Sequence, residues 1–355
     1  MACEWRTALT DASQPGRYKF LSMLILSQAD VERLLPMRDC IEVMASTLAT
    51  LARGDAVLPL RTVIRIPQTR DAFGVMPAYL GSPKIIGAKI VSVFPGNHGT
   101  DLDSHQGAVL LFDRDNGSLA ALLDATAITT IRTAAVSAVA TRALAKQNAS
   151  TLAIIGSGVQ ARAHIEAMCV VRPIASLRVW SRNSEHARQL AAFARDRFHL
   201  DASASGTGAD AVRDVDIVCT VTSSSEPVLR GEWLAPGTHV NAVGACTPYA
   251  REIDSAVVVR SRLYVDRRES ALNEPGDILV PLRDGDIVPE HIVAELGELL
   301  IGRGVGRRDD REITLFKSLG LAIEDLAAAA HVYDQAERAH AGVRVELGGV
   351  RHASH

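Results

Sequence analysis

One short segment constrains the fold of this chain more than any other. Residues 154–161 read Ile-Ile-Gly-Ser-Gly-Val-Gln-Ala, a Gly-x-Gly-x-x-Ala pattern that follows an apolar run and opens a helical pattern. In such a turn Gly156 permits a tight bend, Gly158 lets a pyrophosphate approach the backbone, and Ala161 allows close helix–strand packing. Free N–H groups at the helix N-terminus favour a negatively charged ligand. The segment therefore predicts a dinucleotide-binding βα unit.

The chain around this segment alternates between apolar runs and helical stretches. Helical patterns cover 159–171 and 185–197. Apolar runs predicted as strands lie at 152–155, 177–180, 215–221, 239–243 and 263–265. Continuous apolar strands separated by helices are typical of a parallel sheet that is covered on both faces. The sequence therefore predicts an α/β fold with a Rossmann-type nucleotide domain.

The part of the chain before this domain has a different pattern. Pro36 opens an amphipathic helix that ends at Gly54, and a helix rich in small residues is expected over 128–146. Short β-rich runs lie between these helices, at 61–66, 74–79, 85–93, 108–112 and 119–123. The turn at Asn116 and Gly117 favours a hairpin, because this dipeptide readily adopts positive φ. We therefore expect a mostly antiparallel sheet.

The two ends of the chain complete this plan. The segment 315–341 is predicted to be one long helix without a strand of its own, which packs back on the β-rich domain. Residues 20–26 weakly resemble a secretion signal, but they run into polar residues without a cleavage site, so we reject that interpretation. Residues 1–22 are expected to be a leader, and 348–355 a frayed end.

Composition excludes several classes of function. The 355 residues carry 38 basic and 41 acidic side chains, a net charge of −3, which leaves no electrostatic footprint for nucleic acid. The five cysteines are scattered without a Cys-x-x-Cys pair, so neither a disulfide framework nor a metal site is expected. No apolar run reaches the roughly 18 residues that a membrane helix needs. We expect a cytoplasmic protein that binds small molecules.

The end of the second predicted strand of the nucleotide domain bears on the choice of cofactor. An enzyme that uses NAD normally carries an acidic residue there, which bonds the ribose hydroxyls. This chain has Ser181, Arg182 and Asn183, with no carboxylate before Glu185. The planar fork of Arg182 and the hydroxyl of Ser181 suit a 2′-phosphate. We therefore predict NADPH as the cofactor, with NADH as the alternative.

Three cations, Arg61, Lys89 and Arg132, interrupt apolar or small-residue runs near the expected seam between the domains. Together they would form a receptor for a carboxylate, although strand arginines usually face water. Only five of the 38 basic residues are lysines, which codon bias toward arginine explains. By contrast, Glu274 and Asp277 lie in a Pro-Gly turn and are expected to be solvated.

Several motifs in a fixed order give the chain a family resemblance. They include Leu-Arg-Thr at 60–62, Ser-His-Gln at 104–106, Gly-Ser-Gly-Val-Gln-Ala at 156–161, Asn-Ala-Val-Gly-Ala at 241–245 and the run at 316–325. From about residue 58 to residue 334 the chain resembles the ornithine cyclodeaminase/mu-crystallin family. The mu-crystallin-like ketimine reductase branch is the most similar part of that family.

The resemblance implies a two-domain subunit with its active site between the domains. Residues 131–314 would bind the nucleotide. A β-rich domain that is discontinuous in sequence, 23–130 and 315–355, would bind substrate and form a homodimer. This plan agrees with the predicted C-terminal helix that has no strand of its own.

The resemblance also implies roles for individual residues. Arg61, Lys89 and Arg132 match positions that hold the α-carboxylate of the substrate, and Ser104 and His105 match positions near the nicotinamide. The further cofactor contacts would be Gly156, Ser157, Gly158, Val159, Gln160, Ser181, Arg182, Asn183, Thr222, Asn241, Val243, Lys317 and Ser318.

One departure from the family pattern separates its branches. Cyclodeaminases and the related alanine dehydrogenases carry an aspartate two residues after the glycine of the Asn-Ala-Val-Gly motif. Here Gly244 is followed by Ala245 and then Cys246, a substrate-site candidate whose small size favours a packing role instead. Cyclodeamination needs a base for the distal amine, and a neutral thiol is a poor one. The departure favours the reductase branch.

These observations lead to a mechanistic hypothesis. The chain would use NADPH to reduce Δ1-pyrroline-2-carboxylate or Δ1-piperideine-2-carboxylate to proline or pipecolate. The iminium form accepts hydride better than the imine, so Lys89 or His105 would supply a proton to nitrogen. The sequence does not choose between these two donors.

Three other functions stay open on the sequence alone. The chain would be an ornithine or lysine cyclodeaminase that uses NAD, or an amino-acid dehydrogenase that uses NAD. Alternatively it would be an NADPH-dependent small-ligand-binding protein of mu-crystallin type.

Overall fold

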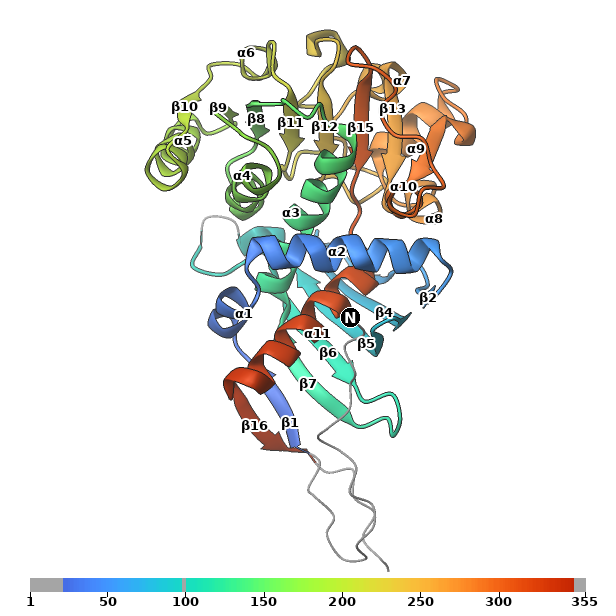
Figure 1. Cartoon of the computed structure of the whole chain (residues 1–355). Coiled ribbons are helices and arrows are strands. Elements are labelled where there is room, and N and C mark those ends of the chain that lie inside the picture. Colours follow the sequence, from blue (N-terminus) through green and yellow to red (C-terminus); the bar gives the residue numbers. More distant parts are fainter. Residues whose placement is uncertain (1–21, 98–99, 348–355) are drawn as a thin grey trace, which may run out of the picture.

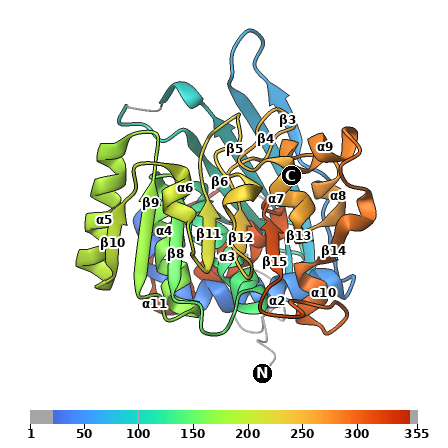
Figure 2. The same cartoon turned by 90° about the horizontal axis from the view of Figure 1, so that it is seen from above.

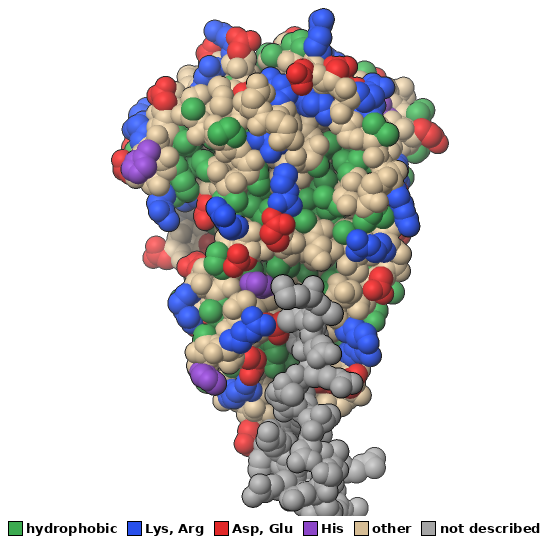
Figure 3. Space-filling model, in the orientation of Figure 1, with side chains coloured by type: hydrophobic (Ala, Val, Ile, Leu, Met, Phe, Trp, Pro, Cys, Tyr) green, Lys and Arg blue, Asp and Glu red, His purple; other side chains and the backbone are tan. Residues whose placement is uncertain are grey.

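The computed structural model describes residues 22–97 and 100–347, which form two sheets, one above the other in Figure 1. Residues 1–21 of the predicted leader and the predicted frayed end at 348–355 lie outside the described residues. No helix of the described residues is both long and apolar enough to cross a membrane. Figure 3 shows basic and acidic side chains interspersed over one face of the molecule.

The upper sheet has the parallel arrangement predicted for the nucleotide domain. Its strands are β8 (Thr151–Ile155), β9 (Ser176–Trp180), β10 (Asp201–Ala204), β11 (Ile217–Thr220), β12 (His239–Ala242), β13 (Ser261–Val265), β14 (Ile292–Glu295) and β15 (Ile313–Lys317). They lie in the order β10-β9-β8-β11-β12-β15-β13-β14, and every neighbouring pair is parallel. The predicted α/β class is therefore confirmed.

Helices connect these strands and cover the sheet. They are α4 (Val159–Val171), α5 (Ser184–Phe198), α6 (Gly208–Val212), α7 (Ser255–Arg260), α8 (Arg268–Ala271), α9 (Gly276–Arg283) and α10 (Leu296–Leu300). Successive residues of β8 belong to two different hydrophobic cores. Leu152 and Ile154 pack in one core, and Ala153 and Ile155 pack in the other. Because side chains alternate along a strand, both faces of the sheet are buried.

The prediction of one long helix over 315–341 is wrong at its start. Residues 313–317 form β15, which pairs with β12 and β13 inside the parallel sheet. All five residues of β15 are buried, because this position is covered on both faces. Helix α11 begins only at Ala322 and ends at Ala339. Strands β10 and β14 are also missing from the prediction.

The lower sheet is mostly antiparallel, as predicted. Its strands are β1 (Ser22–Leu26), β2 (Ala56–Val57), β3 (Thr62–Arg65), β4 (Ala72–Gly81), β5 (Lys84–Val93), β6 (His105–Phe112), β7 (Leu119–Asp124) and β16 (Val343–Glu346). The strand order is β16-β1-β7-β6-β5-β4-β2, with β3 also paired to β4. The β3–β4 hairpin extends beyond the parallel sheet in the view of Figure 2. β1 is parallel to β7, so residues 22–26 of the segment that weakly resembles a signal form a strand of this domain.

Helices α2 (Met37–Ala52), α3 (Ala125–Leu144) and α11 lie between the two sheets (Figure 1). Helices α1 (Gln28–Leu34) and α2 follow β1, and α2 packs on α3 and α11. α11 lies across β4, β5 and β6 on one face of the lower sheet (Figure 1). α3 begins at the end of β7 and reaches α4, β12 and β15 of the upper domain. The seam between the sheets is thus built from α3, α11 and the strand ends beside them.

Candidate active site

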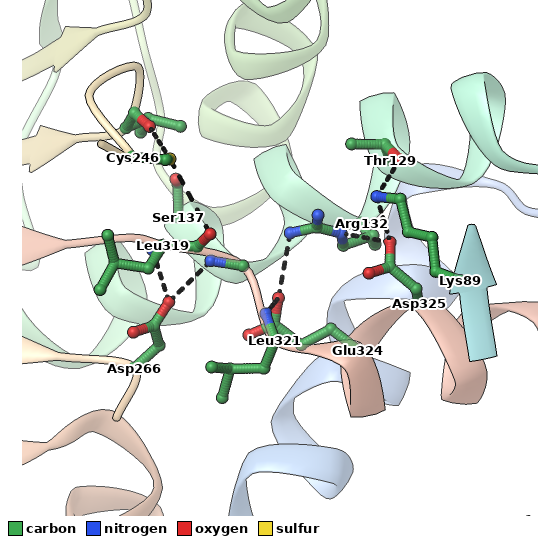
Figure 4. Close-up of polar contacts among 12 residues, drawn as sticks. Lys89, Thr129, Arg132, Ser137, Cys246, Asp266, Leu319, Leu321, Glu324 and Asp325 are labelled. Atoms are coloured by element: carbon green, nitrogen blue, oxygen red, sulfur yellow. Dashed lines mark hydrogen bonds and ion pairs between the residues drawn. The ribbon is translucent and has the colours of Figure 1, made fainter. Parts of the chain in front are cut away.

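A buried cluster of charged side chains lies where β5, α3 and α11 meet (Figure 4). Lys89 on β5 and Arg132 on α3 are 3% and 5% exposed, and Asp325 on α11 is fully buried. Asp325 Oδ1 accepts hydrogen bonds from Lys89 Nζ at 3.1 Å and from Arg132 Nε at 2.9 Å. Lys89 Nζ also donates to Thr129 Oγ1 at 2.6 Å, and Arg132 Nη1 donates to Glu324 Oε2 at 3.1 Å.

Local structure explains why these side chains converge. Thr129 and Arg132 are three residues apart on α3, so they lie on the same face of the helix. Glu324 and Asp325 lie in the first turn of α11, where the helix dipole favours negative charge. Lys89 occupies an inward-facing position of β5, whose burial alternates from Lys84 to Lys89.

The third predicted cation, Arg61, lies beside the same segment. Its Nη2 donates to the carbonyl oxygens of Leu319 at 2.9 Å and Gly320 at 3.0 Å, and it forms an ion pair with Glu274 Oε2 at 2.8 Å. Arg61 lines a small pocket together with Met76, Glu274 and Gly320. The structure therefore brings all three predicted cations to the segment from the end of β15 to the first turn of α11.

That loop is held in a conformation that only glycine adopts easily. Gly320 has φ +76, and an added Cβ would lie 2.5 Å from Arg132 Nη1. The buried Asp266 Oδ2 accepts the backbone N–H groups of Leu319 at 2.6 Å and Gly320 at 2.9 Å. The bend at Gly320 thus leaves room for the Arg132 guanidinium.

Burial and charge together set the protonation of this cluster. Burial, with Arg132 and Arg61 acting in the same direction, lowers the pKa of Lys89 to about 8, although Asp325 opposes this shift. Burial opposes ionisation of Asp325, but Arg132 and Lys89 outweigh it and hold the pKa of this carboxyl below its usual range. Burial raises the pKa of Glu324 despite the neighbouring Arg132. Lys89 can therefore gain and lose a proton near neutral pH.

The predicted dinucleotide turn follows β8. Gly156 has φ +124, and an added Cβ would lie 2.7 Å from Val221 O, so glycine is required there. Gly158 caps α4, and an added Cβ at this residue would meet nothing within 4 Å. Val159 is 56% exposed at the start of α4. The turn is therefore tight on the sheet side and open at the helix N-terminus.

Two contacts connect this turn to its surroundings. Ser157 Oγ lies 2.8 Å from Ser181 Oγ, at the end of β9. Gln160, in the first turn of α4, donates from Nε2 to Thr129 O at 3.5 Å. Because Thr129 also bonds Lys89, the glycine turn and the charged cluster are adjacent.

The segment predicted to bind a 2′-phosphate lies at the open end of β9. Arg182 and Asn183 are exposed, and Ser181 is half-buried. Asn183 Oδ1 caps α5, because it accepts the N–H groups of Glu185 at 2.9 Å and His186 at 3.3 Å. This cap explains the asparagine by structure alone, whereas Arg182 stays directed to the surface.

Glu252 joins the loops that follow β11 and β12. This fully buried carboxylate accepts the backbone N–H groups of Thr222 and Gly244, both at 2.5 Å, and the Thr220 hydroxyl at 2.9 Å. Val243 N donates to Thr220 O at 3.0 Å. Thr222 and Val243 are thus held together at the C-terminal ends of β11 and β12.

The other predicted cofactor contacts in this region are buried. Lys317 Nζ lies 3.0 Å from Asp277 Oδ2, and both side chains are fully buried. Asn241 Nδ2 donates to Thr141 Oγ1 at 2.9 Å, and its Oδ1 has no hydrogen-bond partner among the described residues. The Ser318 hydroxyl likewise has no partner in the part of the chain that the structure describes.

The remaining candidates lie at the borders of the cluster. His105 begins β6, with Nδ1 3.1 Å from Ser104 Oγ. Lys89 lies opposite Val109 of β6. His105 precedes Val109 by four residues, so it lies on the same face of β6, about 13 Å along the strand from Val109. Cys246 Sγ lies 3.6 Å from Val243 O and 3.9 Å from Leu319 O, and burial raises the pKa of its thiol. The Cys246 thiol is therefore neutral, and it lies beside the loop between β15 and α11 that Arg61 contacts.

The expectation that Glu274 and Asp277 are solvated is wrong. Glu274 pairs with Arg61, and Asp277 is fully buried, where it accepts the N–H groups of Glu252 at 2.8 Å and Ile253 at 3.2 Å. Asp277 Oδ2 also lies 3.0 Å from Lys317 Nζ at the end of β15, so the Pro-Gly turn packs against the parallel sheet. Local turn chemistry carries no signal of that burial.

The sequence prediction also misses four carboxylates. Asp325 and Glu324 partner the predicted cations, and Asp266 and Glu252 accept backbone N–H groups of the neighbouring loops. Acidic residues at a helix start usually serve as caps, so only the motif at 316–325 pointed to this region. Within the described residues, no group of three His, Cys, Asp or Glu side chains is placed to hold a metal ion.

Known proteins resemble this chain over most of its length. The family model for the ornithine cyclodeaminase/mu-crystallin family matches residues 22–340. The ketimine reductase mu-crystallin of Mus musculus is 42% identical over 281 residues, 79% of this chain and 86% of the mouse protein.

Two solved structures are similar to this chain over most of its length. The Δ1-pyrroline-2-carboxylate reductase of Thermococcus litoralis, solved with NADH and L-proline, has a TM-score of 0.89 at 39% identity, covering 91% of this chain and 100% of that one. An archaeal alanine dehydrogenase dimer with bound NAD has a TM-score of 0.87 at 32% identity, covering 92% and 100%. The chain belongs to the ornithine cyclodeaminase/mu-crystallin family.

Proposed function

We propose that this chain reduces a cyclic ketimine carboxylate, Δ1-pyrroline-2-carboxylate or Δ1-piperideine-2-carboxylate, to proline or pipecolate. The observation that carries the proposal is that two buried cations, Lys89 and Arg132, lie beside the glycine turn. Thr129 connects them to it, because it bonds both Lys89 and Gln160. The similar mouse and Thermococcus litoralis proteins are named as reductases of ketimines and of Δ1-pyrroline-2-carboxylate.

The glycine turn fits a nicotinamide dinucleotide. The open space beside Gly158 and the N–H groups of the first turn of α4 suit a pyrophosphate, and Gly156 accommodates the close approach to Val221. Gly156, Ser157, Gly158, Val159 and Gln160 would hold that group. When bound, the reduced nicotinamide supplies the hydride that the C=N carbon accepts.

The three cations would hold the substrate carboxylate. Lys89 has three N–H groups, of which Asp325 and Thr129 accept two, so the third is available for the substrate. Arg132 uses Nε and Nη1 for Asp325 and Glu324 and keeps its other donors for a planar carboxylate. Arg61 would close the site from the β3 side. Binding in one orientation lowers the barrier, because the reacting atoms are held at close range.

We propose Lys89 as the proton donor to the imine nitrogen. Its pKa of about 8 allows a protonated ammonium at neutral pH that can still release a proton. His105 lies about 13 Å along the strand from the position opposite Lys89, which supports a role near the nicotinamide instead. The neutral thiol of Cys246 supports reduction over cyclodeamination, which needs a base for the distal amine.

For the cofactor, we propose NADPH. The exposed guanidinium of Arg182 and the Ser181 hydroxyl beside the glycine turn suit a 2′-phosphate, and β9 ends without a carboxylate before Glu185. The similar solved structures contain NADH or NAD, so the comparison of both cofactors is part of the test. Thr222, Asn241, Val243, Lys317 and Ser318 would contact or support the remaining part of the dinucleotide.

We further propose a homodimer and a division of labour between the sheets. Residues 131–314, extended through β15, would bind the nucleotide, and the other sheet would bind substrate and form the dimer. The face of the lower sheet opposite α11 carries Tyr79, Ile86 and Phe112 as cross-strand neighbours. One of the similar structures is a dimer, which supports a second copy of this chain as the occupant of that face.

Purified protein with NADPH or NADH and either cyclic imine tests the proposal. We expect saturable oxidation of the cofactor and formation of proline or pipecolate. No turnover with either imine, together with turnover of an open-chain keto acid plus ammonia, would move the function to an amino-acid dehydrogenase. Release of ammonia from ornithine or lysine with NAD would establish a cyclodeaminase. Tight NADPH binding without any of these reactions would leave a binding protein.

A further inference from the structure

We propose that Asp325 is the positioning residue of the site. Its carboxylate fixes the direction of the Lys89 ammonium and offsets the repulsion between the positive charges of Lys89 and Arg132. The expected effects on kcat/KM rest on the proposed reduction, whereas the effect on the Lys89 ammonium does not. Nothing in the motif assigned Asp325 a role, because an acidic residue in the first turn of a helix is ordinary.

The geometry of the carboxylate supports this role. A single oxygen, Oδ1, lies 3.1 Å from Lys89 Nζ and 2.9 Å from Arg132 Nε, so it joins a strand cation to a helix cation. The other oxygen, Oδ2, has no hydrogen-bond partner among the described residues. Because Asp325 is fully buried, water does not compete with Lys89 and Arg132 for the bridging oxygen (Figure 4).

The hydrogen bond to Asp325 restricts the direction of the Lys89 ammonium group. An ammonium has three N–H groups in tetrahedral directions. Asp325 takes one, and Thr129 Oγ1 takes another at 2.6 Å. The Thr129 hydroxyl donates to Ala125 O at 2.5 Å, so its oxygen accepts from Lys89. With two directions fixed, the third N–H has one direction left, in which it would meet the substrate.

The charge of Asp325 also favours the protonated form of Lys89. The charged groups that act on Lys89 are Asp325 from α11, Arg132 from α3 and Arg61 from the segment before β3, and Glu324 pairs with Arg132. Cys40 of α2 also borders this cluster, but burial keeps its thiol neutral. The two arginines disfavour a protonated Lys89, whereas Asp325 favours it. Removal of the Asp325 charge therefore lowers the pKa of Lys89 further.

The variant Asp325→Asn tests the proposal. We expect kcat/KM for the cyclic imine to fall roughly 10- to 100-fold, the factor for loss of one hydrogen bond to a charged group. We also expect the decline of kcat/KM at high pH to begin at a lower pH than in the wild type, because less Lys89 is protonated. A wild-type pH profile in Asp325→Asn would overturn the proposal.

Asp216→Asn is the matched control. Asp216 Oδ1 also pairs with a lysine, Lys146, at 2.8 Å, but at the start of β8 and away from the cluster. This variant should lose stability without a change in the pH profile. An equal shift in both variants would show a general effect of charge removal, and Asp325 would lose its special role.

A readout without turnover separates this proposal from the proposed function. The chain has five lysines, so labelling of lysine side chains with 15N gives few signals, and Lys89→Arg identifies the one from Lys89. The titration midpoint of that signal should be lower in Asp325→Asn than in the wild type or in Asp216→Asn. If the wild type reduces no imine but this midpoint moves, the proposed function fails and the positioning role stands. An unmoved midpoint with an active wild type overturns the positioning role alone.

Asp325→Glu covers the outcome that Asp325→Asn does not fold. The longer side chain keeps the charge but displaces the oxygen that joins the two cations. We expect its pH profile to match the wild type while kcat/KM falls at least about tenfold. Wild-type kcat/KM in Asp325→Glu would show that the position of the carboxylate is irrelevant, which contradicts a positioning role.

Discussion

At the scale of single residues, the choice of lysine at position 89 has a chemical reason. Lysine and arginine carry the same charge, but an ammonium can lose a proton and a guanidinium cannot. The burial of Lys89 brings its pKa to about 8, near the pH where the reaction would run. A carboxylate anchor alone would not require this property.

Lys89→Arg separates the two possible roles of this residue. We expect kcat to fall by about 10²- to 10⁴-fold, the usual contribution of general acid catalysis, while binding of proline changes little. The wild type should lose activity as pH rises through about 8, since the protonated lysine is the active form. Steady-state kinetics across pH and proline titration measure both effects.

Lys84→Arg provides the control for this substitution. Lys84 is exposed at the start of the same strand and should tolerate arginine without a kinetic effect. Normal turnover in Lys89→Arg would reduce Lys89 to an anchor for the carboxylate.

Arg182 gives a second prediction at this scale. Arg182→Ala should raise the KM for NADPH by roughly 10- to 100-fold, because a charge-assisted bond to the 2′-phosphate is lost, and leave the KM for NADH nearly unchanged. Arg188→Ala, which removes another exposed arginine from the neighbouring helix, should change neither constant. An equal effect of Arg182→Ala on both cofactors would count against the proposed NADPH preference.

At the scale of elements, the loop between β15 and α11 decides where the cations lie. Its segment 318–321 follows a buried strand and precedes the helix with Glu324 and Asp325. Gly320 lets the backbone pass beside Arg132, and Asp266 holds the N–H groups of the bend. A change in this loop therefore acts on the site without contacting the substrate.

Gly320→Ala should both destabilise the protein and impair binding. The left-handed conformation costs an alanine about 1–2 kcal/mol, and its Cβ would also displace the Arg132 guanidinium. We expect a lower denaturation midpoint and a higher KM for the imine. Gly302→Ala has the same backbone conformation, φ +74, with nothing within 4 Å of the added Cβ. It should lose comparable stability and keep its KM, so a raised KM in both variants would contradict the argument.

Elements also show where sequence patterns succeed. The strands β4, β5 and β7 and the helices α2 and α4 lie within a few residues of their predicted positions, because their periodicity and bounding turns are local signals. The pattern predicts a helix where most of β15 lies, since a short apolar run is compatible with either structure when it is buried. β10 escapes prediction because an edge strand that reads Asp-Ala-Ser-Ala has no apolar pattern.

At the scale of the whole molecule, the lower sheet has two different faces. α11 covers one face, and the other presents apolar side chains, of which Ile86 is 43% and Phe112 is 36% exposed. These two residues face each other across β5 and β6, and Tyr79 lies opposite Ile86 on β4. Such an aligned apolar face is typical of an interface with another chain.

Ile86→Asp should convert the proposed dimer into a monomer, because a charge at this position would be buried without a partner. Sedimentation velocity measures the change in mass directly. Val288→Asp, at a residue that is 59% exposed on the parallel-sheet domain, should leave the mass of the wild type unchanged. A dimer that survives Ile86→Asp would place the interface elsewhere.

The sequence by itself determined the nucleotide fold, the family and the three cations of the site. The signals for them are local, namely a glycine turn after an apolar strand, alternating elements and short motifs. Only the tertiary structure decided which carboxylates these cations meet. Asp325 lies 236 residues from Lys89, and no local pattern encodes a contact over that separation. Burial then gives the contact its chemical effect, because a charge without water depends on the partners that the fold brings to it.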